Sequence, residues 1–182
     1  MTRLFKRQVI NMNYLFEDHG LSWQNFDERA YIRSASHFTA VATKLQDGKK
    51  ALFTDLTGEK LKQVLIASCS MPFMMDPAPT PDGLCLDGGI ADSIPFDVAQ
   101  EQGYDKIVVV RTRDTSYRKK PSSRPVCQLY RRYFKDYPQF AEAGILRPEV
   151  YNQQVAQIEH LRRTGQIFNI APQHPVKVGR VE

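Results

Sequence analysis

The alternation of apolar and polar residues predicts a β-hairpin in the first third of the chain. Residues 38–45 (FTAVATKL) and 51–56 (ALFTDL) are two β-prone runs separated by residues 46–49 (QDGK). Because an Asp-Gly pair supplies the positive φ angles of a tight turn, the two runs are predicted to pair as antiparallel strands. A helical period follows over residues 59–68, and the Met71-Pro72 pair ends it.

A strand, a helix and a second strand are predicted further along the chain. Residues 84–86 (LCL) form a short apolar strand, and Pro95 opens a helix over residues 96–102. Residues 106–112 (KIVVVRT) are a continuous β-branched run, which is typical of a strand covered on both faces. This order predicts a parallel strand pair with a right-handed crossover, and therefore an α/β domain with a mainly parallel sheet.

The last third of the chain is predicted to be largely helical. Apolar residues form one stripe over residues 148–164, and Gly165 ends the helix. The stripe consists of Tyr151, Val155, Ile158 and Leu161. Short extended segments are predicted after this helix, at residues 167–171 and 176–181.

Composition narrows the class of protein without assigning a function. The chain has 182 residues, 42% of them hydrophobic and 25% charged, which suits one folded domain and excludes a disordered chain. Three cysteines without a C-x-x-C pair favour a reducing compartment. No apolar run approaches the ~18 residues of a membrane span, and the start lacks the apolar stretch of a signal peptide. A cytoplasmic location is therefore predicted, with no metal or other cofactor.

Basic residues are concentrated in the segment 111–135, which has nine Lys and Arg residues against one acidic residue, Asp114. Five of them are candidate contacts for an anionic membrane surface or for phosphate head groups. These are Arg111, Arg113, Arg118, Lys119 and Lys120. The alternative is a solvated loop and helix face without such a role. Nucleic acid is not the expected partner, because no recognised nucleic-acid motif accompanies these residues.

The sharpest local motif is Asp87-Gly88-Gly89, at the end of the predicted strand 84–86. An acidic residue in this place lies where open α/β sheets put their sites, and glycines beside it let another group approach the carboxylate. The same residues also fit a plain turn in which Asp87 caps the following backbone. The local sequence leaves both interpretations open.

The order of motifs around Asp87 resembles that of the patatin-like phospholipases. Residues 66–72 (IASCSMP), the Pro-rich segment 76–83, the Asp-Gly-Gly motif and residues 92–95 (DSIP) follow one another as they do in that family. The resemblance is strongest over residues 36–120. It implies a three-layer α/β/α fold and a lipid acyl hydrolase, in which a serine attacks a lipid or other ester and an aspartate acts as its base. By this resemblance, Asp87 corresponds to the family's aspartate, and the small residues beside it correspond to Gly88 and Gly89.

The sequence departs from the family at the nucleophile. The family's serine stands in a G-x-S-x-G turn, whereas the nearest pattern here, residues 20–24 (GLSWQ), lacks the second glycine. We therefore expect residues 1–182 to be the C-terminal portion of a patatin-like domain, with a helical extension over residues 121–182, its N-terminal part missing, and no activity alone. A clone boundary, a mis-set start codon or a split gene would each yield such a chain.

A missing N-terminal part predicts unpaired sheet edges and uncovered apolar faces. Residues 1–35, self-association of the chain or the missing segment would cover them. The rival interpretation is a non-catalytic module that keeps the fold and binds an anionic membrane or nucleic acid through residues 111–135.

Overall fold

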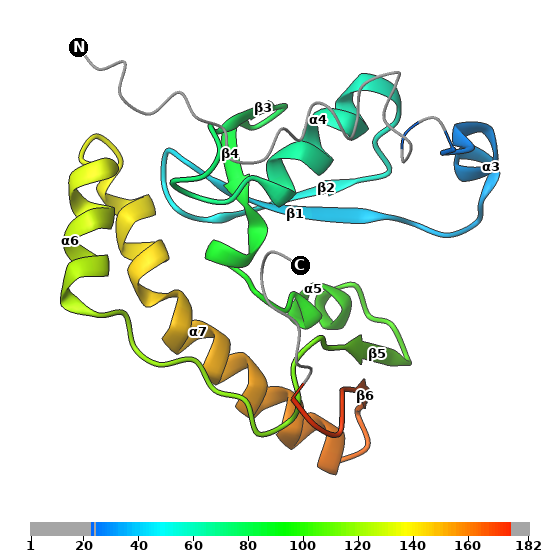
Figure 1. The fold of residues 1–182 in the computed structure, drawn as a ribbon. Coiled ribbons are helices and arrows are strands. Elements are labelled where there is room, and N and C mark those ends of the chain that lie inside the picture. Colours follow the sequence, from blue (N-terminus) through cyan, green and yellow to red (C-terminus); the bar gives the residue numbers. More distant parts are fainter. Residues whose placement is uncertain (1–22, 24, 176–182) are drawn as a thin grey trace.

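The computed structural model describes residue 23 and residues 25–175, which form helices and strands in mixed order (Figure 1). In chain order the elements are α3 (Glu28–Arg33), β1 (Thr39–Lys44), β2 (Lys50–Thr54), α4 (Gly58–Cys69), β3 (Ala78–Thr80), β4 (Gly83–Asp87), the 3₁₀ turn η1 (Gly88–Ile90), α5 (Phe96–Glu101), β5 (Ile107–Val110), α6 (Arg124–Tyr133), α7 (Pro138–Arg163) and β6 (Ile167–Ile170). The α/β class predicted from the sequence is confirmed.

The larger sheet has four strands in the order β2-β1-β4-β3, and every pairing within it is antiparallel. The predicted hairpin is its first half, with Ala42 opposite Ala51 in register. At the hairpin turn Gly48 has a φ of 68°, and an added Cβ would lie 2.7 Å from the backbone oxygen of Gln139. The turn therefore needs glycine at this position for two reasons, its backbone conformation and its close approach to α7.

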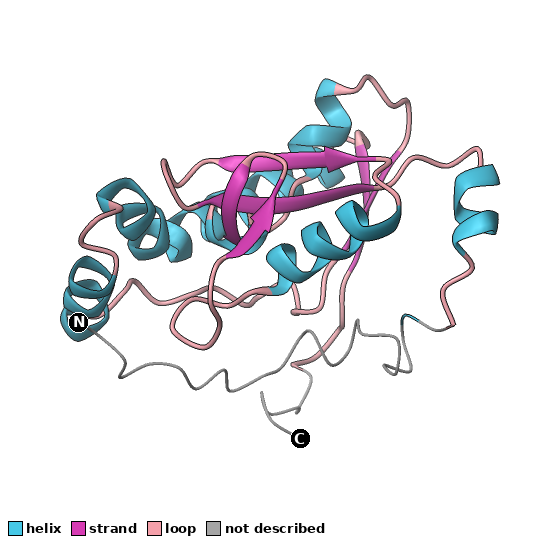
Figure 2. Ribbon diagram, turned by 90° about the horizontal axis from the view of Figure 1, so that it is seen from above, coloured by secondary structure: helices cyan, strands magenta, loops and turns pink. Residues whose placement is uncertain are grey.

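The second half of strand β4 is buried on both faces, which gives the fold three layers around it. On one face Cys85 packs with Val64 and Ala67 of α4. On the other face Leu86 packs with Tyr130 of α6 and Phe140 of α7. Seen from above, the strands lie together with helices flanking them (Figure 2). Since successive side chains of a strand point to opposite faces, two adjacent apolar residues are enough to join the layers.

The mainly parallel sheet predicted from the strand–helix–strand order is not confirmed. Strand β4 pairs with β1 and β3, whereas β5 pairs only with β6 among the described residues, in a separate two-stranded parallel sheet. The helix α5 does connect β4 to β5, as predicted, but the two strands do not share a sheet. Hydrophobic periodicity reports which segments are strands, whereas their pairing partners depend on contacts between segments that are distant in sequence.

The C-terminal helix α7 begins ten residues earlier than predicted and contains Pro148 in its interior. A proline inside a helix lacks the N–H that would bond to the carbonyl four residues back, so it commonly marks a helix end. Here the helix continues because residues on both sides of Pro148 are buried against the core, Ile145 before it and Tyr151 after it. Gly144 lets α6 and α7 approach closely, since an added Cβ would lie 2.2 Å from the Tyr130 ring.

The small sheet of β5 and β6 is covered on one face only within the described part of the chain. Val109 and Ile167 pack against Phe96 and Ile158. The opposite face leaves apolar side chains exposed: Val108 is 57%, Val110 70%, Phe168 66% and Ile170 49% accessible. The prediction that the strand in residues 106–112 is covered on both faces is therefore wrong for the described chain. An uncovered apolar face was expected on a different ground, the missing N-terminal part of the domain.

Two further expectations concern the chain ends and membranes. The extended segment predicted at residues 176–181 lies outside the described residues, as do most of residues 20–24. Helix α3 contributes no buried residue. Among the described helices, none is both long enough and apolar enough to cross a bilayer.

The alternation of faces along β5 can be tested with three consecutive valines. Val109→Thr places a hydroxyl in the core and should lower the free energy of unfolding by about 1–3 kcal/mol. Val108→Thr and Val110→Thr alter exposed side chains and should each change it by less than about 0.5 kcal/mol. Urea denaturation followed by circular dichroism measures all three, and equal losses at the three positions would contradict the assignment of faces.

Candidate functional site

A cavity of about 670 Å³ lies beside the end of β4, and Asp87, Gly88 and Gly89 all line it. The rest of its wall comes from elements that are far apart in sequence: β1, the end of α4, the segment before α5, the segment after β5, and α7. The three residues of the Asp-Gly-Gly motif are thus at a concave site, as expected for residues that carry chemistry.

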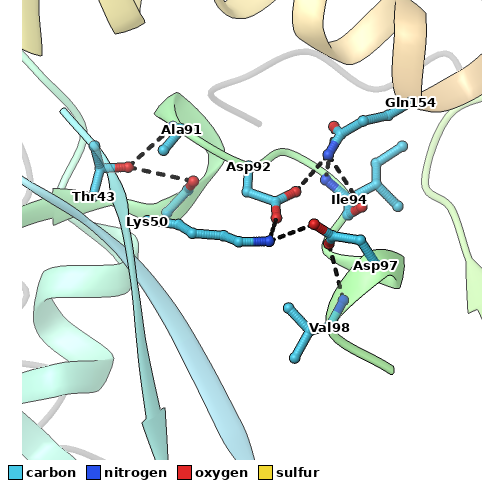
Figure 3. A network of polar contacts seen from close by, with 9 residues as sticks. Thr43, Lys50, Ala91, Asp92, Ile94, Asp97, Val98 and Gln154 are labelled. Carbon is cyan, nitrogen blue, oxygen red and sulfur yellow. Dashed lines mark hydrogen bonds and ion pairs between the residues drawn. The ribbon is translucent and has the colours of Figure 1, made fainter. Parts of the chain in front are cut away.

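Backbone contacts place Asp87 firmly. Its N–H donates to the Ser70 carbonyl at 2.8 Å, and its carbonyl accepts from the Thr43 hydroxyl at 2.8 Å. The same hydroxyl accepts from the Ala91 N–H at 3.1 Å (Figure 3), so Thr43 ties both ends of the turn to β1. The carboxylate Oδ1 accepts from the Gly89 N–H at 2.7 Å. Asp87 therefore caps the turn, as the plain-turn interpretation expects, and it also lines the cavity.

The two glycines of the motif have different roles. An added Cβ on Gly88 would lie 2.2 Å from the backbone oxygen of Val41, a distance that no side chain tolerates. On Gly89 the added Cβ would lie 3.1 Å from Asp87 Oδ1 and 3.3 Å from Arg147 Nη2, both of them side-chain atoms that need shift by only a few tenths of an ångström. Gly88 thus permits the turn to press against β1, whereas Gly89 leaves room for a guanidinium next to the carboxylate.

A network of charged side chains fixes the cavity wall after the turn (Figure 3). Asp92 is buried, and its carboxylate binds Lys50 Nζ at 3.1 Å and Gln154 Nε2 at 2.5 Å. Lys50 also pairs with Asp97, at 2.5 Å. Partial burial lowers the pKa of Lys50, but hydrogen bonds to Asp97 and Asp92 outweigh it and leave that pKa above its ordinary value. A charged Lys50 therefore joins β2, the loop before α5 and, through Gln154, α7.

Two serines line the cavity near Asp87, but neither stands in a strand-to-helix turn. Ser68 lies in the last turn of α4, and the Ser93 hydroxyl donates to the Gly89 carbonyl at 2.8 Å. In the described part of the chain no hydrogen bond joins a serine hydroxyl to the Asp87 carboxylate. Cys69 is no substitute, because desolvation and the charge of Asp87 raise the pKa of its thiol.

The five basic residues proposed from the sequence occupy three kinds of position. Arg111 is buried, and it forms an ion pair with Glu159 at 2.9 Å. Arg113 and Lys119 line the cavity and lie over the rings of Tyr117 and Tyr151, at 5.0 and 4.2 Å from the ring centroids. Arg118 and Lys120 are exposed and do not line the cavity. The cavity is therefore lined by Arg111, Arg113 and Lys119, whereas Arg118 and Lys120 lie on the surface away from it.

Arg147 is the cavity residue that sequence reasoning missed. It comes from α7, in the middle of a segment with no motif, and only the packing of α7 against the turn brings it to Asp87. No group of His, Cys, Asp and Glu able to hold a metal ion occurs within residues 25–175.

Comparison with known families gives two matches. A family model described as "Patatin-like phospholipase" matches residues 3–99, which include β1 to β4 and the Asp-Gly-Gly turn. The chain belongs to the patatin-like phospholipase family. A second model, described as "Domain of unknown function (DUF6363)", matches residues 137–182 and so includes α7. No curated protein matches the sequence.

Family membership confirms the resemblance found in the sequence and makes this a chain of a lipid acyl hydrolase family. The site of this patatin-like chain is built from both matched segments. Asp87 lies in the patatin-like segment, whereas Arg147, Tyr151 and Gln154 lie in the segment of unknown function. The division of the chain into a portion with the motif and an extension over residues 121–182 stays a prediction.

The contrast between the two glycines can be tested directly. Gly88→Ala should lower the free energy of unfolding by about 1–3 kcal/mol or more, since the new methyl group collides with rigid backbone of β1. Gly89→Ala is the matched control, because the groups that it meets can move aside, and its loss should be clearly smaller. Thermal and urea unfolding measure both, and equal losses would show that the turn does not press on β1.

Proposed function

We propose that Asp87 is the base of a Ser-Asp dyad that hydrolyses lipid esters, and that its serine comes from a segment outside these 182 residues. The observation that carries this proposal is the position of Asp87, directly after the buried residues Cys85 and Leu86 of β4 and on the wall of a cavity of about 670 Å³. A cavity of this size accommodates part of a lipid ester. The absence of a G-x-S-x-G sequence from the chain supports the external origin of the serine.

The dyad would work in two steps. The serine oxygen attacks the ester carbonyl carbon while its proton passes to Asp87, and the proton then goes to the departing alcohol as the tetrahedral intermediate collapses. In the second step water attacks the acyl-enzyme carbonyl while its proton passes to Asp87. That proton then goes to the serine oxygen as the bond from serine to the acyl group breaks, which releases the fatty acid and restores the serine and the carboxylate. The Gly89 N–H holds Oδ1 throughout, so the carboxylate keeps its orientation between the steps.

The exposed apolar face of the β5–β6 sheet supports the same proposal. Four large apolar side chains on one face of a small sheet expose a surface that folded domains usually bury. We infer that the segment carrying the serine covers this face, and that a second copy of the chain covers it when that segment is absent. We also propose the cytoplasm as the place of the reaction, since three free cysteines favour a reducing compartment.

The dyad predicts how activity depends on Asp87. The chain alone should not react with a fluorophosphonate probe at any serine, as checked by intact mass. Joined to an upstream coding sequence with G-x-S-x-G, it should hydrolyse p-nitrophenyl esters, and Asp87→Asn should lower kcat by about 10²–10⁴-fold. Asp82→Asn removes the same charge from an exposed turn and should leave kcat unchanged. Labelling of the chain alone, or full activity of Asp87→Asn, would refute the dyad.

A second candidate function, binding to an anionic membrane surface, is favoured by the outer face of α6. Three exposed apolar residues follow one another at helical spacing on this face. They are Val126, which is 39% accessible, Leu129, which is 48% accessible, and Tyr133, which is 39% accessible. Arg124 and Arg132, on the same helix, are exposed as well. An apolar stripe beside basic residues is typical of helices that lie in the lipid interface.

Vesicle binding tests this second function. The chain should sediment with vesicles of phosphatidylcholine and phosphatidylglycerol more than with phosphatidylcholine alone, and salt should weaken the binding. Leu129→Glu should reduce the bound fraction severalfold because it charges the apolar stripe. Leu84→Glu changes a residue of equal exposure on β4, 48%, and should have no effect. Stronger, salt-sensitive binding to single-stranded DNA than to vesicles would favour a nucleic-acid partner instead.

A further inference from the structure

Phe73 has a strained backbone conformation. Its φ angle is 69°, and among the described residues Asp55 is the only other non-glycine residue with a positive φ. Asp is tolerated in this left-handed region, whereas a bulky side chain is an outlier there because its Cβ crowds the following carbonyl oxygen. Strain of this kind persists only where surrounding contacts hold it. The contacts of Phe73 should therefore show what the strain serves.

The turn that contains Phe73 does not by itself require a phenyl ring. The Met74 N–H donates to the Met71 carbonyl at 3.3 Å, so residues 71–74 form a β-turn with Pro72 in second place and Phe73 in third. A positive φ at the third position is normally supplied by glycine, which adopts it without strain. Since glycine would satisfy the turn, the ring has to be explained by what it touches.

The ring of Phe73 joins the turn to helix α6. Its centroid lies 4.7 Å from that of Tyr130, 5.2 Å from that of Tyr133 and 5.5 Å from that of Phe134. The first two pairs are edge to face, an arrangement that aromatic rings favour. Tyr130 and Phe134 are buried, whereas Tyr133 is 39% accessible and belongs to the outer apolar stripe of α6. One ring thus contacts both the core side of α6 and the face proposed to meet lipid.

The same segment holds the last turn of α4, which forms part of the cavity wall. Ser68 lines the cavity. Ser70, three residues before Phe73, is fully buried, and its carbonyl accepts from the Asp87 N–H at 2.8 Å. Because only two residues separate Ser70 from Phe73, a rearrangement of the turn at Phe73 reaches the Ser70 carbonyl and, through it, the end of α4.

We propose that Phe73 is a strained latch that holds the last turn of α4 against the cavity, and that lipid at α6 opens it. The inference rests on the second candidate function, the binding of α6 to a membrane surface. When the outer face of α6 enters lipid, the Tyr133 ring turns toward the apolar phase and leaves Phe73. Phe73 then relaxes to a negative φ, and the Ser70 carbonyl parts from the Asp87 N–H.

Opening the latch widens the cavity without releasing Asp87. The Thr43 hydroxyl still binds the Asp87 carbonyl, at 2.8 Å, and the Gly89 N–H still binds the carboxylate, at 2.7 Å. Only the wall at the end of α4 moves. The cavity is therefore narrower while the chain is in water and wider once α6 lies on a membrane.

Cys69 is a natural reporter of the latch. It is the last residue of α4, next to Ser70, and its side chain is exposed. Desolvation and, after it, the charge of Asp87 raise the pKa of its thiol. Movement of the end of α4 away from Asp87 lowers that pKa and increases the thiolate fraction at a fixed pH. Alkylation of Cys69 by N-ethylmaleimide therefore becomes faster when the latch opens.

The experiment compares the alkylation rate of Cys69 with and without vesicles of phosphatidylcholine and phosphatidylglycerol. It uses the 182-residue chain with Cys127→Ser, which removes the other partly accessible thiol. Bound vesicles should raise the rate severalfold. Leu129→Glu should abolish the rise, whereas Leu84→Glu, on β4, should keep it. An unchanged rate on vesicles that bind the chain would overturn the latch, and so would equally fast labelling of the buried Cys85, which would indicate general unfolding.

Variants at position 73 separate the strain from the ring. Phe73→Ala loses the ring and keeps the strain, so its turn should open and Cys69 should react severalfold faster without lipid. Phe73→Gly loses the ring as well but adopts a positive φ freely, so its turn should stay closed and the rate low. Neither variant should respond to vesicles. Phe73→Leu keeps apolar volume and replaces Phe73→Ala if circular dichroism shows that Phe73→Ala is unfolded. Equal rates in the strained and the glycine variants would overturn the latch.

The outcome is distinguishable from that of membrane binding. Sedimentation with vesicles measures the binding of α6, whereas thiol labelling measures the latch. If the chain sediments and the rate at Cys69 stays the same, the latch is refuted and membrane binding stands. If the chain does not sediment but Phe73→Ala reacts faster than Phe73→Gly, membrane binding and its role as the trigger are refuted and the latch stands.

Discussion

The contact between the Asp-Gly-Gly turn and strand β1 is the constraint on which the site depends. Gly88 lies so close to the Val41 carbonyl that only a residue without Cβ fits there. The Thr43 hydroxyl then bridges the Asp87 carbonyl and the Ala91 N–H. With both ends of the turn tied to a central strand, the Asp87 carboxylate has little freedom, which is what its proposed role as a base requires.

Helix α7 is the second structural element that the site needs. It supports the turn through the core around Phe140, and it also brings Arg147, Gln154 and Glu159 to the cavity or to its supporting contacts. A segment that a separate family model describes thus completes a wall of the patatin-like site. The helix survives an internal proline because the residues on both sides of it are buried, so packing outweighs the lost hydrogen bond.

Local signals in the sequence predicted the elements well. The Asp-Gly turn of the hairpin, the helix of residues 58–69 and the short strand ending in Asp87 all follow from periodicity and turn chemistry, which act over a few residues. Periodicity and turn chemistry did not predict which strands pair with one another. Strands β4 and β5 join different sheets because β1 pairs with β4 and β6 pairs with β5, and neither partner is a neighbour in the pattern that predicted them.

By itself, the sequence predicted the family and the α/β class, and it contains an Asp-Gly-Gly motif without a G-x-S-x-G turn, because each of these depends on residues close together in the chain. Only the tertiary structure decided which basic residues lie at the cavity. Arg111 proved to be buried and paired with Glu159, and Arg147, which carried no motif, proved to lie beside Asp87. Burial and proximity arise from contacts between distant segments, so no local pattern of residue types can report them.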